Sequence, residues 1–206
     1  MCGFTSTRDA QLAVDAGVDA IGFIFAKESP RAITLEVARE IADAMPVFVQ
    51  LVAVFVEPTQ EDVSEALRAG FIVQFSGREL WQTTEAFAAG PYVKTYHVDA
   101  AAPPMPSEFE AFARGYNHAT WMFETKAESV AGGSGKTFPW ALARFLAGNR
   151  RIVISGGLHA ENVADCIHAV RPFGVDVRSG IETDGVKDQE KMHAFVRAVK
   201  EADAKA

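Results

Sequence analysis

Short apolar segments alternate with amphipathic segments along the whole chain, and this alternation limits the available folds more than any other feature. Several apolar segments are nearly continuous, such as 20–25 and 152–154, which is typical of parallel strands buried on both faces. We predict strands near residues 2–5, 19–25, 48–56, 71–75, 92–97, 119–124, 151–155 and 174–177. We predict helices near residues 8–16, 34–45, 60–69, 78–89, 107–115, 138–147, 160–170 and 188–203.

This pattern favours one architecture over its nearest alternative. The 206 residues divide into units of about 26 residues, close to the lower limit for a (β/α)8 TIM barrel. An open, doubly wound sheet is the alternative, but no G-x-G-x-x-G follows the first predicted strand. We therefore predict an α/β fold, a (β/α)8 TIM barrel that forms a single domain over residues 1–206. We interpret segment 100–106, which is rich in alanine and proline, as a connecting loop.

The charge balance disfavours several classes of partner. The chain carries 27 acidic and 20 basic residues, and its net charge of −7 disfavours non-specific binding to nucleic acid or to an anionic membrane. No run approaches about 18 apolar residues, and the first residues do not resemble a signal peptide. Cys2 and Cys166 make no disulfide framework. We predict a cytoplasmic protein that binds neither nucleic acid nor membrane, and we expect a monomer.

Two kinds of signal support the predicted helices. Segments 59–62 and 107–110 match the capping box that begins many helices. The apolar residues Val163, Cys166, Ile167 and Val170 recur at helical spacing, so one stripe of that helix is expected to be buried. Cys166 is therefore interpreted as a core thiol.

The ends of the predicted strands carry the candidates for chemistry, because a TIM barrel has its active site at the carboxyl ends of its strands. Cys2 ends the first predicted strand, and its thiolate would be a base or a nucleophile. Arg31 follows the second, and a guanidinium suits a substrate carboxylate. Glu124 ends the sixth beside aromatic residues, where desolvation favours a general acid. Pairing of Glu124 with Lys126 is the alternative, and His97 is a weaker candidate.

Glycines follow the seventh and eighth predicted strands, at Gly156, Gly157 and Gly180, and Ser179 precedes the last of them. Each group opens a helical segment, so backbone N–H groups can converge there on a phosphate. The alternative is that these glycines only shape tight turns. Segment 132–136 lacks the spacing of a P-loop, and we interpret it as part of a lid at residues 126–137. No histidine pair has the spacing of metal ligands, so we predict no metal.

Together these segments resemble one family, the phosphoribosylanthranilate isomerases of tryptophan biosynthesis. The resemblance extends over nearly the whole chain, and its motifs are specific jointly although each is weak alone. They are Cys2-Gly3-Phe4-Thr5, residues 17–25, Ser29-Pro30-Arg31, Val54-Phe55-Val56, residues 132–138, Ser155-Gly156-Gly157-Leu158, Glu161-Asn162-Val163 and residues 171–177.

The resemblance implies an Amadori rearrangement of N-(5-phosphoribosyl)anthranilate to 1-(2-carboxyphenylamino)-1-deoxyribulose 5-phosphate, with no cofactor. It implies that Glu124 is the acid that opens the furanose ring and that Cys2 is the base that removes the C2 proton. It implies that Arg31 binds the anthranilate carboxylate and that Asp176 lies near the bridging amine. The phosphate-binding residues that it implies are Gly156, Gly157, Ser179 and Gly180.

Several positions depart from the family pattern. Glu124 stands where the family has Asp, and a displacement of about 1 Å at a reacting group can lower a rate about 100-fold. Ser76 replaces a histidine, Pro139 replaces an aspartate, and Arg178 replaces the first serine of a Ser-Ser-Gly motif. The family also has residues before the cysteine, so we expect either a start upstream of Met1 or a weakened site.

These departures leave two alternatives open. One is a divergent barrel with weak or no activity that binds a phosphorylated ligand or a partner. The other is an isomerase for a related aminoaldose phosphate.

Overall fold

Parallel strands and helices alternate in the structure as the sequence predicts. The computed structural model describes residues 1–99, 101–125 and 137–205. Strands β1 to β7 form one sheet in which the order of the strands follows their order in the chain. The strands are β1 (Ala20–Ile24), β2 (Gln50–Phe55), β3 (Ile72–Phe75), β4 (Tyr92–Val98), β5 (Ala119–Thr125), β6 (Ile152–Ser155) and β7 (Gly174–Val175). The helices are α1 (Thr7–Ala16), α2 (Leu35–Ala42), α3 (Gln60–Arg68), α4 (Trp81–Ala88), α5 (Pro106–Ala113), α6 (Trp140–Ala147), α7 (Val163–Val170) and α8 (Gln189–Asp203).

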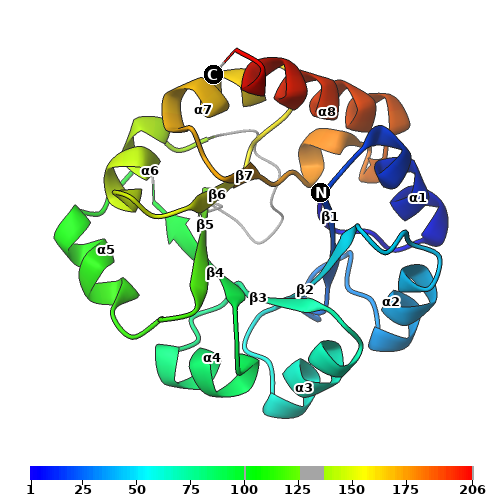
Figure 1. Ribbon diagram of the computed structural model, residues 1–206, viewed down its shortest axis with the longest axis horizontal. Helices are drawn as coiled ribbons and strands as arrows, with labels where there is room; N and C mark the ends of the chain where they lie inside the picture. Colours follow the sequence, from blue (N-terminus) through cyan, green and yellow to red (C-terminus); the bar gives the residue numbers. More distant parts are fainter. Residues whose placement is uncertain (100, 126–136, 206) are drawn as a thin grey trace. The chain divides into compact units, whose positions relative to one another are not determined.

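The chain packs as two compact units, which are Met1–Thr95 with Gly115–Thr120, and Tyr96–Arg114 with Trp121–Ala206. In the first unit β1, β2 and β3 pair in parallel, and α1, α2 and α3 lie on one side of these strands (Figure 1). The core of this unit includes Phe23, Val73 and Phe75, each fully buried. Burial of large apolar side chains is the main free-energy gain that holds such layers together.

Helix α3 begins at the capping box that the sequence predicts. The Thr59 hydroxyl accepts the Asp62 N–H at 3.2 Å, and Asp62 Oδ2 accepts the Thr59 N–H at 2.9 Å. Each bond satisfies a backbone donor that the first helical turn leaves free.

The prediction of a capping box at 107–110 is wrong. Helix α5 begins at Pro106, and the carboxylate of Glu108 accepts the Met105 N–H at 2.6 Å. Proline suits the first position of a helix because its φ is already helical and its missing N–H is not needed there. The helix therefore begins two residues before the position that the Ser107 motif indicated, with Met105 rather than Ser107 as the N-cap.

The predicted strand at 2–5 is reduced to one parallel bridge between Cys2 and Gly22. The Gly22 N–H donates to the Met1 carbonyl at 2.8 Å, and the Gly3 and Phe4 N–H groups both donate to the Gly22 carbonyl. Gly3 has a φ of 80°, which ends the extended conformation. The segment therefore lies along β1 but cannot continue a ladder with it.

In the second unit, β5, β6 and β7 pair in parallel, and aromatic side chains hold β5 in place. The Phe109 ring of α5 packs edge-on against Trp121 at 5.2 Å and Phe123 at 5.1 Å between ring centroids. Such pairs add to the free energy gained from burial alone. Because Glu124 comes next in β5, this packing also fixes the strand end that carries it.

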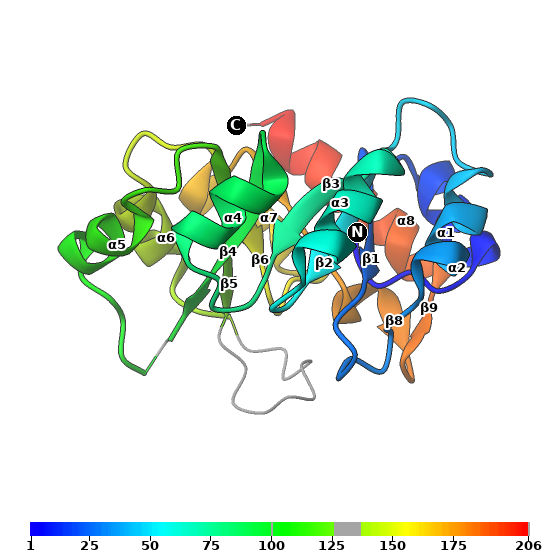
Figure 2. The same cartoon turned by 90° about the horizontal axis from the view of Figure 1, so that it is seen from below.

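The remaining elements of this unit follow β7. They are a 3-10 helix, η1 (Ser179–Ile181), and an antiparallel pair, β8 (Glu182–Thr183) and β9 (Val186–Lys187), which precede α8 (Figure 2). In α7 the predicted stripe is buried, and Cys166 has no exposed surface, as expected. Among the helices of the described residues, none is long and apolar enough to cross a bilayer.

Candidate active site

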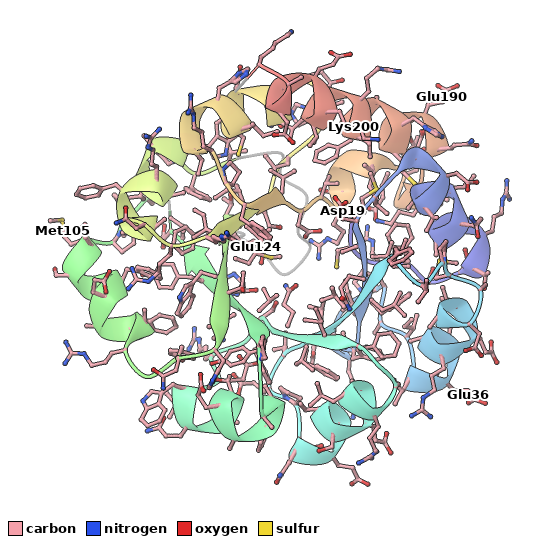
Figure 3. All side chains as sticks on the ribbon, viewed as in Figure 1. Asp19, Glu36, Met105, Glu124, Glu190 and Lys200 are labelled. Carbon is pink, nitrogen blue, oxygen red and sulfur yellow. The ribbon has the colours of Figure 1, made fainter. Side chains whose placement is uncertain are left out.

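Glu124 lies near the carboxyl end of β5, within the second unit (Figure 3). It is paired in register with Ser155 of β6. Because successive strand residues point to opposite faces, the burial of Phe123 among the aromatic residues directs Glu124 to the other face. The side chain remains 29% exposed.

Three ionisable groups act on the Glu124 carboxyl. His97 of β4 places its Nδ1 3.5 Å from Glu124 Oε2, while Arg178 and Asp176 follow β7. Surrounding protein atoms remove water from the carboxyl, and this desolvation, the largest effect, raises the pKa of Glu124. His97 and Arg178 act in the opposite direction, and the negative charge of Asp176 raises the pKa further. The result is a partly exposed carboxyl that keeps its proton to higher pH than an ordinary glutamic acid.

Asp176 is held by its neighbours on β6. Its N–H donates to the Ile154 carbonyl at 2.8 Å, and Ser155 Oγ donates to Asp176 Oδ2 at 3.3 Å. Arg178, two residues later, has a buried Nε with no hydrogen-bond partner among the residues that the structure describes. The segment after β7 therefore presents one carboxylate and one guanidinium beside Glu124.

The turn after β6 contains Gly156 and Gly157, with φ values of 86° and 70°. Side chains rarely adopt this region, and a Cβ on Gly156 would lie 2.8 Å from the Thr125 nitrogen. The amide of Asn162 closes the turn, since its Nδ2 donates to the Gly157 carbonyl at 3.0 Å and its Oδ1 accepts the His159 N–H at 2.9 Å. Both glycines are therefore required by the backbone.

The turn after β7 packs directly on the turn after β6. Ser179 begins η1, and a Cβ on Gly180 would overlap the carbonyl oxygen of Leu158. The four residues expected at the phosphate thus lie in two adjoining turns of one unit. Binding of phosphate there stays a prediction, which the close approach of the two backbones supports.

Cys2 belongs to the first unit, where its thiol is half-buried and is not part of a disulfide. A Cβ on Gly22 would lie 2.9 Å from Cys2 Sγ and 3.2 Å from Cys2 Cβ. Real side-chain atoms do not approach so closely, so the space above Gly22 is occupied by the thiol itself. The absence of a side chain on β1 therefore decides where the sulfur lies.

Arg31 also belongs to the first unit and follows β1, as expected. Its N–H donates to Ser29 Oγ at 3.2 Å, and Ala32 forms a parallel bridge with Ile24 of β1. The loop is therefore tied to the strand end. Two further predictions, the pairing of Glu124 with Lys126 and the lid at 126–137, rest almost entirely on residues 126–136, outside the described residues.

Lys94, another polar residue of a predicted strand, forms a buried ion pair and is assigned a structural role. Its side chain is fully buried and its Nζ lies 2.6 Å from Oε2 of Glu79, which is 1% exposed. Sequence reasoning did not single out Glu79, although a lysine inside an otherwise apolar strand signals a buried partner. His97, a weaker candidate from the sequence, lies beside the proposed acid in the structure.

Comparison with known proteins decides the family. A model of the N-(5'-phosphoribosyl)anthranilate (PRA) isomerase family matches residues 1–198. The chain belongs to this family. The N-(5'-phosphoribosyl)anthranilate isomerase of Pelobacter propionicus is 41% identical over 204 residues, covering 98% of this chain and 94% of that protein.

Solved structures of the same family also match. Phosphoribosyl anthranilate isomerase from Thermotoga maritima is 34% identical, with a TM-score of 0.85 over 98% of this chain and 97% of that one. A relative in complex with reduced 1-(o-carboxyphenylamino)-1-deoxyribulose 5-phosphate is 33% identical, with a TM-score of 0.79 over 97% and 96% of the two chains. These matches confirm the predicted fold class, the (β/α)8 TIM barrel.

Proposed function

We propose that this chain catalyses the Amadori rearrangement of N-(5-phosphoribosyl)anthranilate to 1-(2-carboxyphenylamino)-1-deoxyribulose 5-phosphate in tryptophan biosynthesis. Membership of the family over residues 1–198 carries this proposal. A relative of similar length binds a reduced form of the product, which supports the same ligand class here. Proton transfers alone complete the rearrangement, so we predict no cofactor.

Glu124 acts as the general acid in this proposal. Its protonated carboxyl donates to the furanose ring oxygen, the C1–O bond breaks, and the amine nitrogen supplies the electron pair that forms the Schiff base. The raised pKa of Glu124 supports this role, because the protonated form that must donate persists closer to neutral pH. As pH rises through that pKa the acid is lost, so activity falls on the alkaline side.

Cys2 acts as the base in the second step. Its thiolate removes the proton from C2, and the electrons of that C–H bond form the enolamine. The enolamine then gains a proton at C1 and loses the O2 proton to give the ketone. A half-buried thiol that is not in a disulfide and lies beside a glycine supports this role, because it is partly accessible and held in one place.

The substrate contacts follow from the chemistry of the side chains. Arg31 binds the anthranilate carboxylate, for which a guanidinium offers paired donors. Asp176, oriented by Ser155 on the neighbouring strand, accepts from the bridging amine. The phosphate is bound by backbone N–H groups in the two adjoining turns, at Gly156, Gly157, Ser179 and Gly180.

The number of subunits and the compartment stay predictions. A Thermotoga maritima member of the family is described as dimeric. We nevertheless propose a monomer for this chain, together with a cytoplasmic location. A gel-filtration measurement with light scattering decides between one and two copies.

The proposal is tested by pairing turnover with ligand binding. Cys2→Ala and Glu124→Ala are each expected to lower kcat by roughly 10²- to 10⁴-fold, as loss of a general acid or base does. Both variants should still bind reduced 1-(2-carboxyphenylamino)-1-deoxyribulose 5-phosphate in calorimetry, because the phosphate turns are unchanged. Glu190→Ala, on the exposed first turn of α8, is the control and should match the wild type.

Two results would contradict the proposal. Wild-type turnover in either variant would remove that residue from its role. Failure of the unmodified chain to restore growth of a tryptophan auxotroph that lacks this step would favour a barrel that only binds ligand. Glu124→Asp is expected to raise kcat/KM, because the family places the shorter acid at this position.

A further inference from the structure

An acid that donates its proton to the ring oxygen must be protonated again before the next turnover. Glu124 is 29% exposed, and protein atoms surround the rest of its carboxyl. We propose that His97 is a proton relay that returns this proton from solvent to Glu124. The inference rests on the proposed function, because it takes Glu124 as the acid.

The geometry favours His97 over its neighbours. Its Nδ1 lies 3.5 Å from Glu124 Oε2, and its side chain is 41% exposed, so one part of the imidazole meets the acid while the ring also reaches water. A distance of this size in a ligand-free site is expected to shorten when substrate binds. His97 and Glu124 lie near the ends of β4 and β5, in the same unit.

The other charged groups that face Glu124 cannot transfer this proton. Arg178 acts as a fixed charge, because a guanidinium does not lose its proton in proteins. Asp176 acts as a like charge, and Ser155 Oγ already donates to its Oδ2. Imidazole is the side chain that most readily gains and loses a proton near neutral pH. Of the described groups that act on this carboxyl, His97 is therefore the one suited to a relay.

The relay balances atoms and charge. After ring opening Glu124 is a carboxylate. The His97 imidazolium transfers its Nδ1 proton to Glu124 Oε2, which leaves a neutral imidazole and a neutral carboxylic acid. A proton from water then restores the imidazolium. The relay acts after the first turnover, because the proton that Glu124 donates in that turnover was taken up before substrate was added.

The test is rapid-mixing kinetics of His97→Gln in dilute buffer. The first turnover should keep the wild-type rate, while later turnovers should be roughly ten-fold slower, a smaller loss than removal of the acid itself. Product should therefore appear as a burst of one equivalent per site. Added imidazole should restore the later turnovers in proportion to its concentration and leave the wild type unchanged. A residue that only shapes the site would slow the first turnover and would not respond to imidazole.

His118→Gln is the matched control, since His118 also pairs with a glutamate, with its Nδ1 2.6 Å from Glu85 Oε2, in the other unit. It should show no burst and no response to imidazole. His97→Asn is measured in the same way, so that the test remains valid if His97→Gln does not fold.

Absence of a burst in both His97 variants, or a burst that imidazole does not remove, would overturn the relay. Glu124→Gln distinguishes a failure of the proposed acid from a failure of the proposed relay. If that variant turns over like the wild type, the proposed acid is wrong. If it is inactive while both His97 variants behave like the wild type, only the relay is wrong.

Discussion

Gly22 of β1 has no side chain, and this absence determines the position of the Cys2 thiol. The thiol of Cys2 occupies the space that a Cβ on Gly22 would need. The surrounding backbone is held on both sides, since Gly22 exchanges hydrogen bonds with Met1 and Gly3. A larger residue at position 22 therefore has to move the sulfur, because the backbone around it is fixed by the bridge.

We predict that Gly22→Ala lowers kcat/KM by about 10- to 100-fold, since a displacement of about 1 Å at a reacting group has effects of that size. The rate of alkylation of Cys2 should change with it, which ties the loss to the thiol. Gly90→Ala is the matched control, because its Cβ would meet no atom nearer than 4.0 Å. Unchanged kcat/KM in Gly22→Ala would show that the site tolerates the shift.

At the scale of elements, a buried ion pair ties the loop after β3 to β4. Glu79 Oε2 lies 2.6 Å from Lys94 Nζ, and its Oε1 accepts the N–H groups of Glu57 at 2.9 Å and Gly77 at 3.1 Å. Lys94 also donates to the Gly77 carbonyl at 2.8 Å. Both carboxylate oxygens of Glu79 and the ammonium group of Lys94 are buried, and each has a hydrogen-bond partner. These bonds hold the loop and the strand together.

We predict that Lys94→Met lowers the free energy of unfolding by about 3–5 kcal/mol, because it leaves the Glu79 carboxylate buried and unpaired. Glu79→Gln combined with Lys94→Met should lose less than the sum of the two single changes. Arg150→Met removes the exposed pair with Glu110 and should cost much less than Lys94→Met, because solvent screens an exposed pair. Urea titration followed by circular dichroism measures all four variants, and equal losses from Lys94→Met and Arg150→Met would contradict this account.

At the scale of the whole molecule, the reactivity of the two cysteines distinguishes the folded protein from the unfolded one. Cys2 is half-buried, whereas Cys166 is fully buried in α7, and burial raises the pKa of its thiol to about 12. The thiolate is the form that reacts, and its removal from water is unfavourable in the apolar core. Cys166 can therefore react only when the fold that surrounds it opens.

We predict that iodoacetamide at about pH 8 modifies Cys2 in the folded protein and leaves Cys166 unmodified until denaturant is added. Mass spectrometry of peptides after timed quenching measures both sites at once. Cys2→Ser serves as the control, and it should acquire no label while folded. Modification of Cys166 as fast as Cys2 in native buffer would mean that α7 opens readily.

Much of the fold was predictable because its signals are local. Hydrophobic periodicity and turn residues indicated the order of β1 to β7 and of the helices between them, and the capping box at Thr59 indicated where α3 begins. The prediction was wrong at residues 2–5, where Gly3 ends the extended segment, and at Ser107, where Pro106 begins the helix. In both cases the backbone conformation that a glycine or a proline favours overrode the pattern of the neighbouring residues.

The sequence alone determined the order of the elements, the candidate acid and thiol at strand ends, and the motifs that point to the family, because each depends on residues close together in the chain. Three contacts become visible only in the folded protein: His97 faces Glu124, Gly22 leaves room for Cys2, and Lys94 pairs with Glu79. These depend on which side chains of separate strands or loops become neighbours. That choice follows from register and burial, which no single segment of sequence contains.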